Sequence, residues 1–294
     1  MESNIVLSKT EKNRVALISF FVAVFLTFFK GVVGFATGSL GIISEALHSA
    51  MDVFAAGLTV FSVRLSSKPP DETHNFGHGK IENISALIES LILVATCIWI
   101  VWEAIERLTS KEPQVIVNFW SFFVVSFAII VDFNRAKILS KMAKKHKSQA
   151  LEADALHFSS DILSSGAVLL GLVLTYFNIH IADTIAALFV SIIILYMSFR
   201  LSFRAIDELL DRAPKEIKKK VQEIVNGISD VKYVHDIKIR TSGATTFIDL
   251  NIHLDPKISI EEAHIIAHRV ENEIKKTYSN CNIHIHQEPN SQHE

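Results

Sequence analysis

The sequence is poor in cysteine and in charged residues, and both shortages narrow the kinds of protein that it can encode. Its 294 residues include two cysteines, Cys97 and Cys281, which can neither build a disulfide framework nor form a Cys-x-x-Cys pair. A metal bound by this chain would therefore be held by histidine and carboxylate side chains. Charged residues make up 20% of the chain and hydrophobic residues 49%, and the mean hydropathy of +0.32 predicts a membrane protein.

Several sequence signals of other protein classes are also missing. The net charge is -2, and no basic stretch with interleaved aromatics occurs, so we expect no nucleic-acid binding. Neither the His-Glu-x-x-His nor the Gly-x-Ser-x-Gly motif of hydrolases occurs. The polar segment 1–14 leads into an apolar run that is too long for the core of a signal peptide, so we expect no cleavage.

Six apolar segments approach or exceed the length of about 20 residues that a helix needs to cross the hydrocarbon core of a bilayer. The second and fifth of them are interrupted by His, Asp and Ser, which weakens their hydropathy signal. We predict an all-α membrane domain of six transmembrane helices in residues 1–211. The expected spans are Val15–Ala36, Leu40–Val63, Ile84–Ile105, Val115–Val131, Ala155–Phe177 and Ile181–Leu201.

Lysine and arginine gather in alternate connections between these spans. They are frequent before the first span and in the 2–3 and 4–5 loops, whereas the 1–2 and 5–6 loops have none and the 3–4 loop has only Arg107 and Lys111. Because cytoplasmic loops carry the excess of positive charge, both termini are predicted to be cytoplasmic, which six spans satisfy. The chain is thus expected to be a multi-pass protein in the lipid bilayer of the cell inner membrane.

Residues 212–294 have the composition of a soluble domain. Their pattern predicts the order α-β-β-α-β, a small cytoplasmic α/β domain of the ferredoxin-like type. Its core is small at about 80 residues, so oligomerisation is an expected source of stability. The expected elements are a helix from Lys215 to Gly227, strands Val231–Arg240 and Thr246–Leu254, a helix opened by the Ser259 and Glu262 capping box, and a strand Asn282–His286.

Two His-x-x-x-Asp motifs lie inside predicted spans, His48 with Asp52 in the second and His157 with Asp161 in the fifth. In each pair the spacing places both side chains on one helix face. A carboxylate at mid-span costs about 2.5–3.5 kcal/mol, so these residues need a reason to be there. If the two helices pack together, two imidazoles and two carboxylates form a tetrahedral set that suits a zinc-like ion. The alternative is that each residue only hydrogen-bonds a neighbouring helix.

Further candidate ligands lie outside the spans. Asp71, His74 and His78 share a glycine-containing loop that can wrap a cation or remain solvated. The soluble domain holds seven of the 13 histidines. Among them, His284 and His286 alternate with isoleucines, so both point away from the core, toward a ligand site or toward solvent.

Five segments resemble signatures of the cation diffusion facilitators, and the resemblance runs from about Lys12 to Pro289. They are Ser44-Glu-Ala-Leu-His-Ser-Ala-Met-Asp52, Ala153-Asp-Ala-Leu-His-Phe-Ser-Ser-Asp161, Asp71-Glu-Thr-His-Asn-Phe-Gly-His-Gly-Lys80, Leu209-Leu-Asp-Arg-Ala213 and His284-Ile-His-Gln-Glu-Pro289. The resemblance implies a homodimeric metal–proton antiporter with six helices and a cytoplasmic ferredoxin-like domain.

The resemblance also implies roles for individual residues. It implies a Lys80–Asp211 ion pair. The family often has histidine at a strand position that is Asn251 in this chain. His253 lies two residues further along and therefore on the same face of the strand, so it joins the candidate ligands. The implied ligands are His48, Asp52, His157 and Asp161 for transport, Asp71, His74 and His78 in the loop, and His235, His264, His286 and Glu288, with His253, in the soluble domain.

The predicted function is efflux of zinc from the cytoplasm in exchange for protons, by alternating access and without enzymatic chemistry. Imidazole and carboxylate bind metal only when deprotonated, and an unperturbed imidazole titrates at about pH 6.5. Two imidazoles favour zinc over manganese, while iron(II), cobalt, nickel and cadmium stay open. Zinc is also the expected regulatory ion of the soluble domain. The rival interpretations are an intramembrane metalloenzyme and a passive metal channel.

Overall fold

The computed structural model describes residues 2–37, 40–109, 119–176 and 181–290, which form two compact units. The first unit comprises Met1–Pro69 and Ile81–Ile206, and the second comprises Pro70–Lys80 and Asp207–Glu294. The loop between the second and third helices therefore groups with the C-terminal segment, although most of the chain N-terminal to Asp207 is in the other unit.

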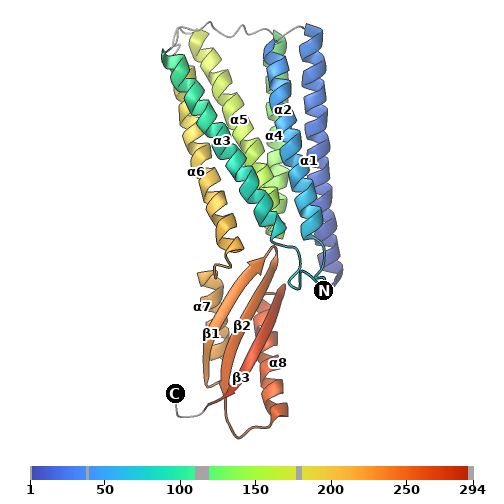
Figure 1. Cartoon of the computed structure of the whole chain (residues 1–294), viewed down its shortest axis with the longest axis vertical. Helices are drawn as coiled ribbons and strands as arrows, with labels where there is room; N and C mark the ends of the chain where they lie inside the picture. The colour runs from blue at the N-terminus through green and yellow to red at the C-terminus, as the bar shows by residue number, and fades with distance from the viewer. Residues whose placement is uncertain (1, 38–39, 110–118, 177–180, 291–294) are drawn as a thin grey trace. The chain divides into compact units, whose positions relative to one another are not determined.

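Six long helices make up the first unit (Figure 1). Each predicted span overlaps one of them, although the expected start of the fourth span at Val115 and the expected end of the fifth at Phe177 lie outside the described residues. Within the described residues, α1, α2, α3 and α6 are long and apolar enough to cross a membrane. The helices are α1 (Glu2–Thr37), α2 (Leu40–Ser66), α3 (Ile81–Thr109), α4 (Phe119–His146), α5 (Gln149–Tyr176) and α6 (Ile181–Leu209).

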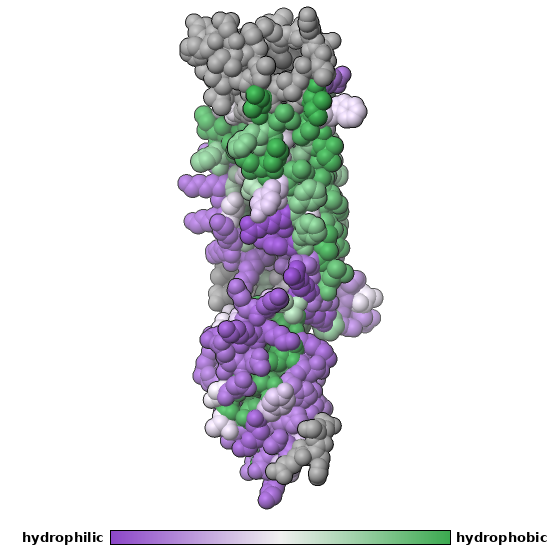
Figure 2. Space-filling model, turned by 90° about the vertical axis from the view of Figure 1, so that its left-hand side faces the viewer, coloured by the Kyte–Doolittle hydropathy of each residue, from purple (hydrophilic) through white to green (hydrophobic). Residues whose placement is uncertain are grey.

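Small residues line the contacts among these helices. α1 packs on α2, α4 on α5, and α5 also contacts α2 and α3. Ala56, Ala86 and Ala153 are completely buried, and such residues let helix backbones approach closely. Large apolar side chains such as Phe28 and Phe35 point outward instead, as expected for helices that face lipid. On the face shown in Figure 2, hydrophobic side chains gather over the helical unit.

A buried acidic side chain at the start of α3 joins several helices of this unit. Glu82 is 2% exposed, and its Oε1 accepts hydrogen bonds from Lys12 Nζ on α1 at 2.6 Å and from Ser66 Oγ at the end of α2 at 2.8 Å. Its Oε2 accepts from the hydroxyl of Ser148, which precedes α5. Lys12, which precedes the first predicted span, is thus buried and paired with Glu82.

The second unit has the predicted order α-β-β-α-β. A three-stranded sheet runs β1-β2-β3, with β1 antiparallel to β2 and β2 parallel to β3, and α7 and α8 contribute buried residues to its core. The capping box of Ser259 and Glu262 that opens α8 is confirmed. The elements are α7 (Lys215–Asn226), β1 (Tyr233–Ser242), β2 (Thr245–Leu254), α8 (Ile260–Thr277) and β3 (Cys281–Pro289).

Strand alternation decides which residues of the sheet can bind a ligand. Along β2, Ile248, Leu250 and Ile252 are buried in the core, so the residues between them point to the opposite face. The parallel register pairs Asn251 with His286 and His253 with Glu288, and the antiparallel register pairs His235 with Asn251. The face away from the helices therefore carries the histidines and the glutamate.

The loop 70–80 packs against the β1–β2 hairpin inside the second unit. The ring of Phe76 meets the ring of Phe247 edge-on at 5.3 Å, and the guanidinium of Arg240 lies 3.8 Å from the centre of the Phe76 ring. A Cβ on Gly79 would lie 2.6 Å from the carbonyl carbon of Ser242, so only glycine fits this close approach. Three contacts of different kinds thus fix the loop to the hairpin.

Candidate metal centres

The two His-Asp faces of α2 and α5 meet inside the helical unit. His157 Nε2 lies 3.1 Å from Asp52 Oδ1 and 3.9 Å from Asp161 Oδ2, and His48 Nε2 lies 3.7 Å from Asp161 Oδ1. His48, Asp52 and Asp161 each offer a ligand atom within 4.8 Å of the other two. The structure thus brings all four residues of the predicted transport set together, and we call this group the transport centre.

The spacing at the transport centre fits a tetrahedral ion. Ligand atoms about 2.0–2.1 Å from a tetrahedral zinc ion lie about 3.3 Å from one another, and the three separations given above, 3.1, 3.7 and 3.9 Å, are close to that value. The group whose ligand atoms all lie within 4.8 Å of one another comprises His48, Asp52 and Asp161, without His157. The buried Oδ2 of Asp161 has no hydrogen-bond partner among the described residues, which is unusual for a carboxylate. Both observations favour a cation as the missing partner.

Burial makes the transport centre asymmetric. The side chains of His157 and Asp52 are 8% and 12% exposed, whereas that of His48 is 46% exposed. The side of the centre formed by His157 and Asp52 is therefore enclosed by protein, and an ion would enter or leave past His48.

Several buried polar residues surround the transport centre without belonging to the predicted ligand set. Lys30 Nζ donates to Ser49 Oγ at 2.7 Å, and Asp154 Oδ2 accepts from Ser19 Oγ at 3.1 Å. Arg135 pairs with Asp132 at 2.9 Å and lies 3.5 Å from the centre of the Phe158 ring. The sequence pattern predicted Arg135 to lie in the 4–5 loop. Because α4 continues to His146, this arginine instead sits on a helix and is buried.

A second group of candidate ligands lies in the loop 70–80 and is called the loop centre. Asp71 bridges two imidazoles, since its Oδ1 lies 3.3 Å from His74 Nδ1 and its Oδ2 lies 3.3 Å from His78 Nε2. Hydrogen bonds from the backbone of His74 and from the hydroxyl of Thr73 lower the pKa of Asp71 to about 2. The buried Nδ1 of His78 has no partner among the described residues. The carboxylate is thus ionised and the imidazoles converge on it.

A third group lies on the open face of the sheet and is called the sheet centre. His235 Nε2 and His253 Nε2 are 2.9 Å apart, and they lie 3.2 Å and 3.1 Å from Glu288 Oε2. Burial alone would raise the pKa of Glu288, but its hydrogen bond with His235 and the charges of both imidazoles lower it below its ordinary value. The donors are those that zinc takes in proteins, two nitrogens and one carboxylate oxygen.

The remaining predicted ligands of the soluble domain are placed differently. His286 Nε2 lies 3.6 Å from Glu288 Oε1, at the edge of the sheet centre. Asn251 donates a 2.8 Å hydrogen bond from Nδ2 to the same oxygen, so it orients the glutamate. His264 lies on α8 beside His268, and its described contacts do not include the sheet centre.

The predicted ion pair of Lys80 and Asp211 lies within the second unit. Lys80 Nζ is 2.9 Å from Asp211 Oδ1 and donates to the carbonyl oxygen of Leu209 at 3.2 Å. Arg240 Nη1 also lies 4.0 Å from Asp211 Oδ2. The roles of Arg240 and Phe76 were not predicted from the sequence. An aromatic residue in an otherwise polar glycine-containing loop was the available signal.

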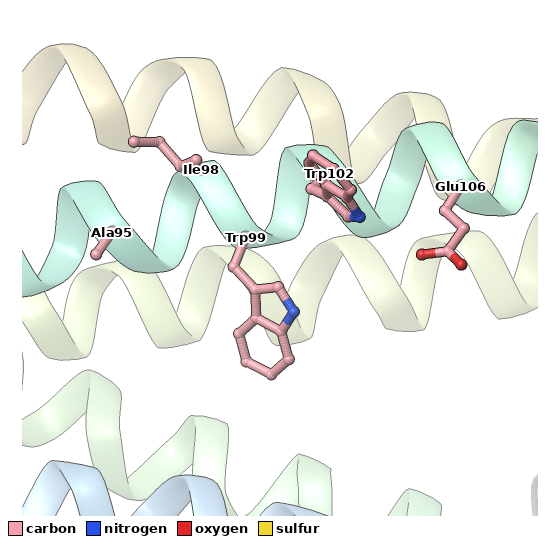
Figure 3. Close-up of a pocket in the computed structure, with 5 residues that line it drawn as sticks. All are labelled: Ala95, Ile98, Trp99, Trp102 and Glu106. Atoms are coloured by element: carbon pink, nitrogen blue, oxygen red, sulfur yellow. The ribbon is translucent and has the colours of Figure 1, made fainter.

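One further hollow lies on the outer face of α3 and is unlike the three centres. Ala95, Ile98, Trp99, Trp102 and Glu106 line it (Figure 3). Among these five, Glu106 is the only side chain of a type that binds metals readily. Tryptophan is enriched at membrane–water boundaries, so this face suits a lipid environment better than a metal ion.

Comparisons with known proteins cover nearly the whole chain. Residues 16–210 match the family described as the cation efflux transmembrane domain, and residues 213–290 match the cation efflux protein cytoplasmic domain. The Cation-efflux pump FieF of Cronobacter sakazakii is 33% identical over 284 residues, which are 94% of this chain and 92% of that protein. The protein of the same name from Escherichia coli O1:K1 is 32% identical over the same shares, and that from Klebsiella pneumoniae is 34% identical over 262 residues, 87% of this chain and 85% of that protein.

Solved structures resemble the C-terminal part of the chain. The metal-bound C-terminal domain of the CzcD transporter from Thermotoga maritima is 25% identical, with 28% of this chain and 98% of that chain covered and a TM-score of 0.27. The nickel form of a single-substitution variant of the MamM C-terminal domain is 19% identical, with 26% of this chain and 100% of that chain covered and a TM-score of 0.26.

Proposed function

This chain belongs to the cation efflux family, and from that premise we propose that it exports zinc from the cytoplasm in exchange for protons. It is a multi-pass membrane protein with a cytoplasmic C-terminal domain and a transporter rather than an enzyme. The observation that carries the proposal is the convergence of His48, Asp52, His157 and Asp161 from two helices, inside a unit built to sit in lipid.

The exchange follows from the chemistry of the transport centre. His157 Nε2 and Asp52 Oδ1 share a hydrogen bond, and the same two atoms are the ones that would ligate a metal ion. Metal and proton therefore compete for the same lone pairs, because imidazole and carboxylate ligate only when deprotonated. Zinc arriving from the cytoplasm releases protons, and protons arriving from the other side release zinc. Alternating access exposes the one centre to each side in turn.

The loop and sheet centres support a regulatory role for cytoplasmic zinc. Each is a cluster of two imidazoles and one carboxylate, and each lies in the second unit, outside the transmembrane helices. Metal that binds only one arrangement of a domain stabilises that arrangement by mass action. We propose that the protein works as a homodimer in the cell inner membrane, and that zinc at these centres tightens the pairing of the two C-terminal domains.

Donor type supports zinc as the transported ion. Two imidazoles with two carboxylates suit zinc, whereas manganese prefers sets richer in oxygen. Iron(II), cobalt, nickel and cadmium accept the same donors, so a competition assay decides among them. Each of these metals is added at the same concentration as zinc, and zinc flux into proteoliposomes is measured. If one of them is the true substrate, that metal should reduce zinc flux at least tenfold. If zinc is the true substrate, each of them should reduce zinc flux little.

Zinc flux and internal pH, the latter reported by a dye inside the vesicles, together test the exchange and distinguish it from passive conduction. Purified protein is reconstituted in vesicles, zinc is added outside, and zinc uptake and internal pH are followed together. The exchange predicts that zinc movement drives opposite proton movement and that an imposed pH gradient accelerates zinc flux several-fold. Zinc flux that ignores the pH gradient would indicate a channel and contradict the proposal.

A further inference from the structure

A glutamate inside the helical unit takes no part in the transport centre, although its burial is costly. Glu89 of α3 is 1% exposed, and its Oε1 accepts hydrogen bonds from Thr59 Oγ1 at 2.8 Å and from Ser85 Oγ at 3.1 Å. Its buried Oε2 has no hydrogen-bond partner, and no lysine, arginine or histidine pairs with it, in the part of the chain that the structure describes. Ionisable residues buried in transmembrane helices mark proton relays and ion pathways in transporters.

Glu89 lies at the depth of the transport centre. The helices α3 and α5 pack on each other and run in the same direction, because α4 returns the chain between them (Figure 1). Their first turns are level, since Glu82 accepts a hydrogen bond from the hydroxyl of Ser148. Glu89 and His157 each lie eight positions beyond the first residue of their helix, which is about 12 Å along the axis.

The charged groups that face Glu89 come from α5. Its strongest charge interactions are with the carboxylate of Asp154 and the imidazole of His157. The helix α2 offers it the hydroxyl of Thr59, and α6 approaches α3 with another hydroxyl, that of Ser202. No hydrogen bond or ion pair joins Glu89 to His157 among the described residues. Glu89 is therefore influenced by the charge of the transport centre without touching its ligands.

The charge of the transport centre decides whether Glu89 is ionised. A buried carboxylate with two hydroxyl donors and no cation is poorly compensated, and the carboxylate of Asp154 disfavours a second negative charge beside it. Zinc brings two positive charges to the same depth, and charges interact strongly over several ångströms in an interior that is poor in water. Binding of zinc thus favours the ionised form of Glu89, and release of zinc favours the protonated form.

We propose that Glu89 is a further proton carrier of the exchange, coupled to zinc by charge and not by ligation. It holds a proton while the transport centre is without zinc. When zinc binds, the O–H bond of Glu89 breaks and the proton passes to water, and a proton from water returns when zinc leaves. This inference rests on the proposed zinc–proton exchange and adds about one proton to it for each zinc.

The test counts the protons released per zinc bound by the full-length protein in detergent, with a pH dye in weakly buffered solution. Asp71→Ala and His253→Ala are present in every protein compared, so that binding to the loop and sheet centres is weakened and the counted zinc lies at the transport centre. Glu89→Gln keeps an oxygen for the two hydroxyls but has no proton to release. It should release about one proton fewer per zinc, and the slope of the logarithm of zinc affinity against pH should fall by about one.

Glu106→Gln is the matched control, because Glu106 is exposed on the outer face of the same helix. It should release as many protons as the protein with native Glu89. A change that merely distorts the transport centre would lower zinc affinity equally at every pH and leave the proton count unchanged. The two readouts together therefore distinguish a proton carrier from a structural residue.

Infrared difference spectra test the inference in the protein with native Glu89, even if Glu89→Gln does not fold. Zinc should remove the C=O absorption of a protonated carboxyl group, and this loss should be smaller in Glu89→Gln. An equal proton count in Glu89→Gln, or no such loss with native Glu89, would overturn the role of Glu89 and leave the exchange standing. Zinc binding that releases no proton with native Glu89 would contradict the exchange itself and this inference with it.

Discussion

The two carboxylates of the transport centre have different surroundings. Asp52 takes part in a hydrogen bond with His157, whereas the buried Oδ2 of Asp161 has no such partner among the described residues. Leaving a buried acceptor unsatisfied costs about 1–3 kcal/mol, so the helical unit gives up stability to keep this oxygen available. Such a loss of stability is expected of residues that serve binding rather than folding.

At the level of single residues, we expect Asp52→Ala and Asp161→Ala each to reduce zinc flux at least 100-fold without unfolding the protein. Each removes one of four ligands and also a carboxylate that is costly to bury. Flux in proteoliposomes is measured together with size-exclusion profiles. Ser159→Ala on α5 is the control, because Ser159 Oγ donates to the carbonyl of Ala155 within its own helix. Flux near that of the parent protein in either aspartate variant would remove that residue from the transport centre.

His253 and Asn251 allow a similar test of the sheet centre. His253 presents a nitrogen to Glu288, whereas Asn251 only hydrogen-bonds the same glutamate. We expect His253→Ala to raise the Kd for zinc at this centre at least 100-fold and Asn251→Ala to raise it about tenfold, as for the loss of an orienting partner. Isothermal titration of the two variants, each with the transport centre disabled by Asp52→Ala, measures the difference. Equal Kd values would show that His253 is not a ligand.

At the level of elements, local signals predicted the structure better than long-range ones. The capping box of Ser259 and Glu262 depends on residues three apart, so the start of α8 could be predicted from the sequence. The pairing of Lys12 with Glu82 spans 70 positions in the sequence, and Phe76 and Phe247, which pack together, are separated in the sequence by most of the membrane domain. Such contacts depend on how helices and loops come together, which no local pattern specifies.

In the candidate sites too, local features could be predicted from the sequence better than long-range ones. The one-turn spacing of each His-Asp pair is local, so their shared face was predictable, and their approach to each other required only that α2 and α5 pack. The sheet centre also depends on a parallel β2–β3 register that sequence alternation alone does not give, so the pairing of His253 with Glu288 and of Asn251 with His286 could not be predicted.

The loop centre has an acid dependence that can be measured. Because Asp71 has its pKa lowered to about 2 by hydrogen bonds, its contribution to the folded loop is full above its ordinary value of 3.8 and is lost as the pH falls through about 2. Amide hydrogen exchange in residues 71–78 should therefore be faster in Asp71→Asn than in the parent protein at pH 6, with the difference vanishing near pH 2. A difference that persists at pH 2 would contradict this assignment of the charge.

At the level of the whole molecule, the C-terminal domain, residues 212–294, is expected to respond to zinc by itself. Zinc at 100 times its Kd stabilises a folded domain by about 2.7 kcal/mol, which raises the Tm of a domain of this size by roughly 15 °C. Isolated residues 212–294 should show this shift and become more compact by small-angle scattering as two copies close together. If the fragment folds but shows neither change, the regulatory role of the sheet centre is wrong.

The packing of loop 70–80 on the hairpin has a consequence for recombining this protein with its relatives. A chimera that exchanges only the chain after Asp207 would set a foreign hairpin against the native Phe76 and Gly79, and any side chain larger than the native Ser242 would crowd the position where Gly79 has no Cβ. Two crossovers around residues 70–80 and a third near 207 would move the loop and the hairpin as one inherited block. The same block is what natural divergence has to keep compatible, although 126 residues of membrane domain, Ile81–Ile206, separate its two parts in the gene.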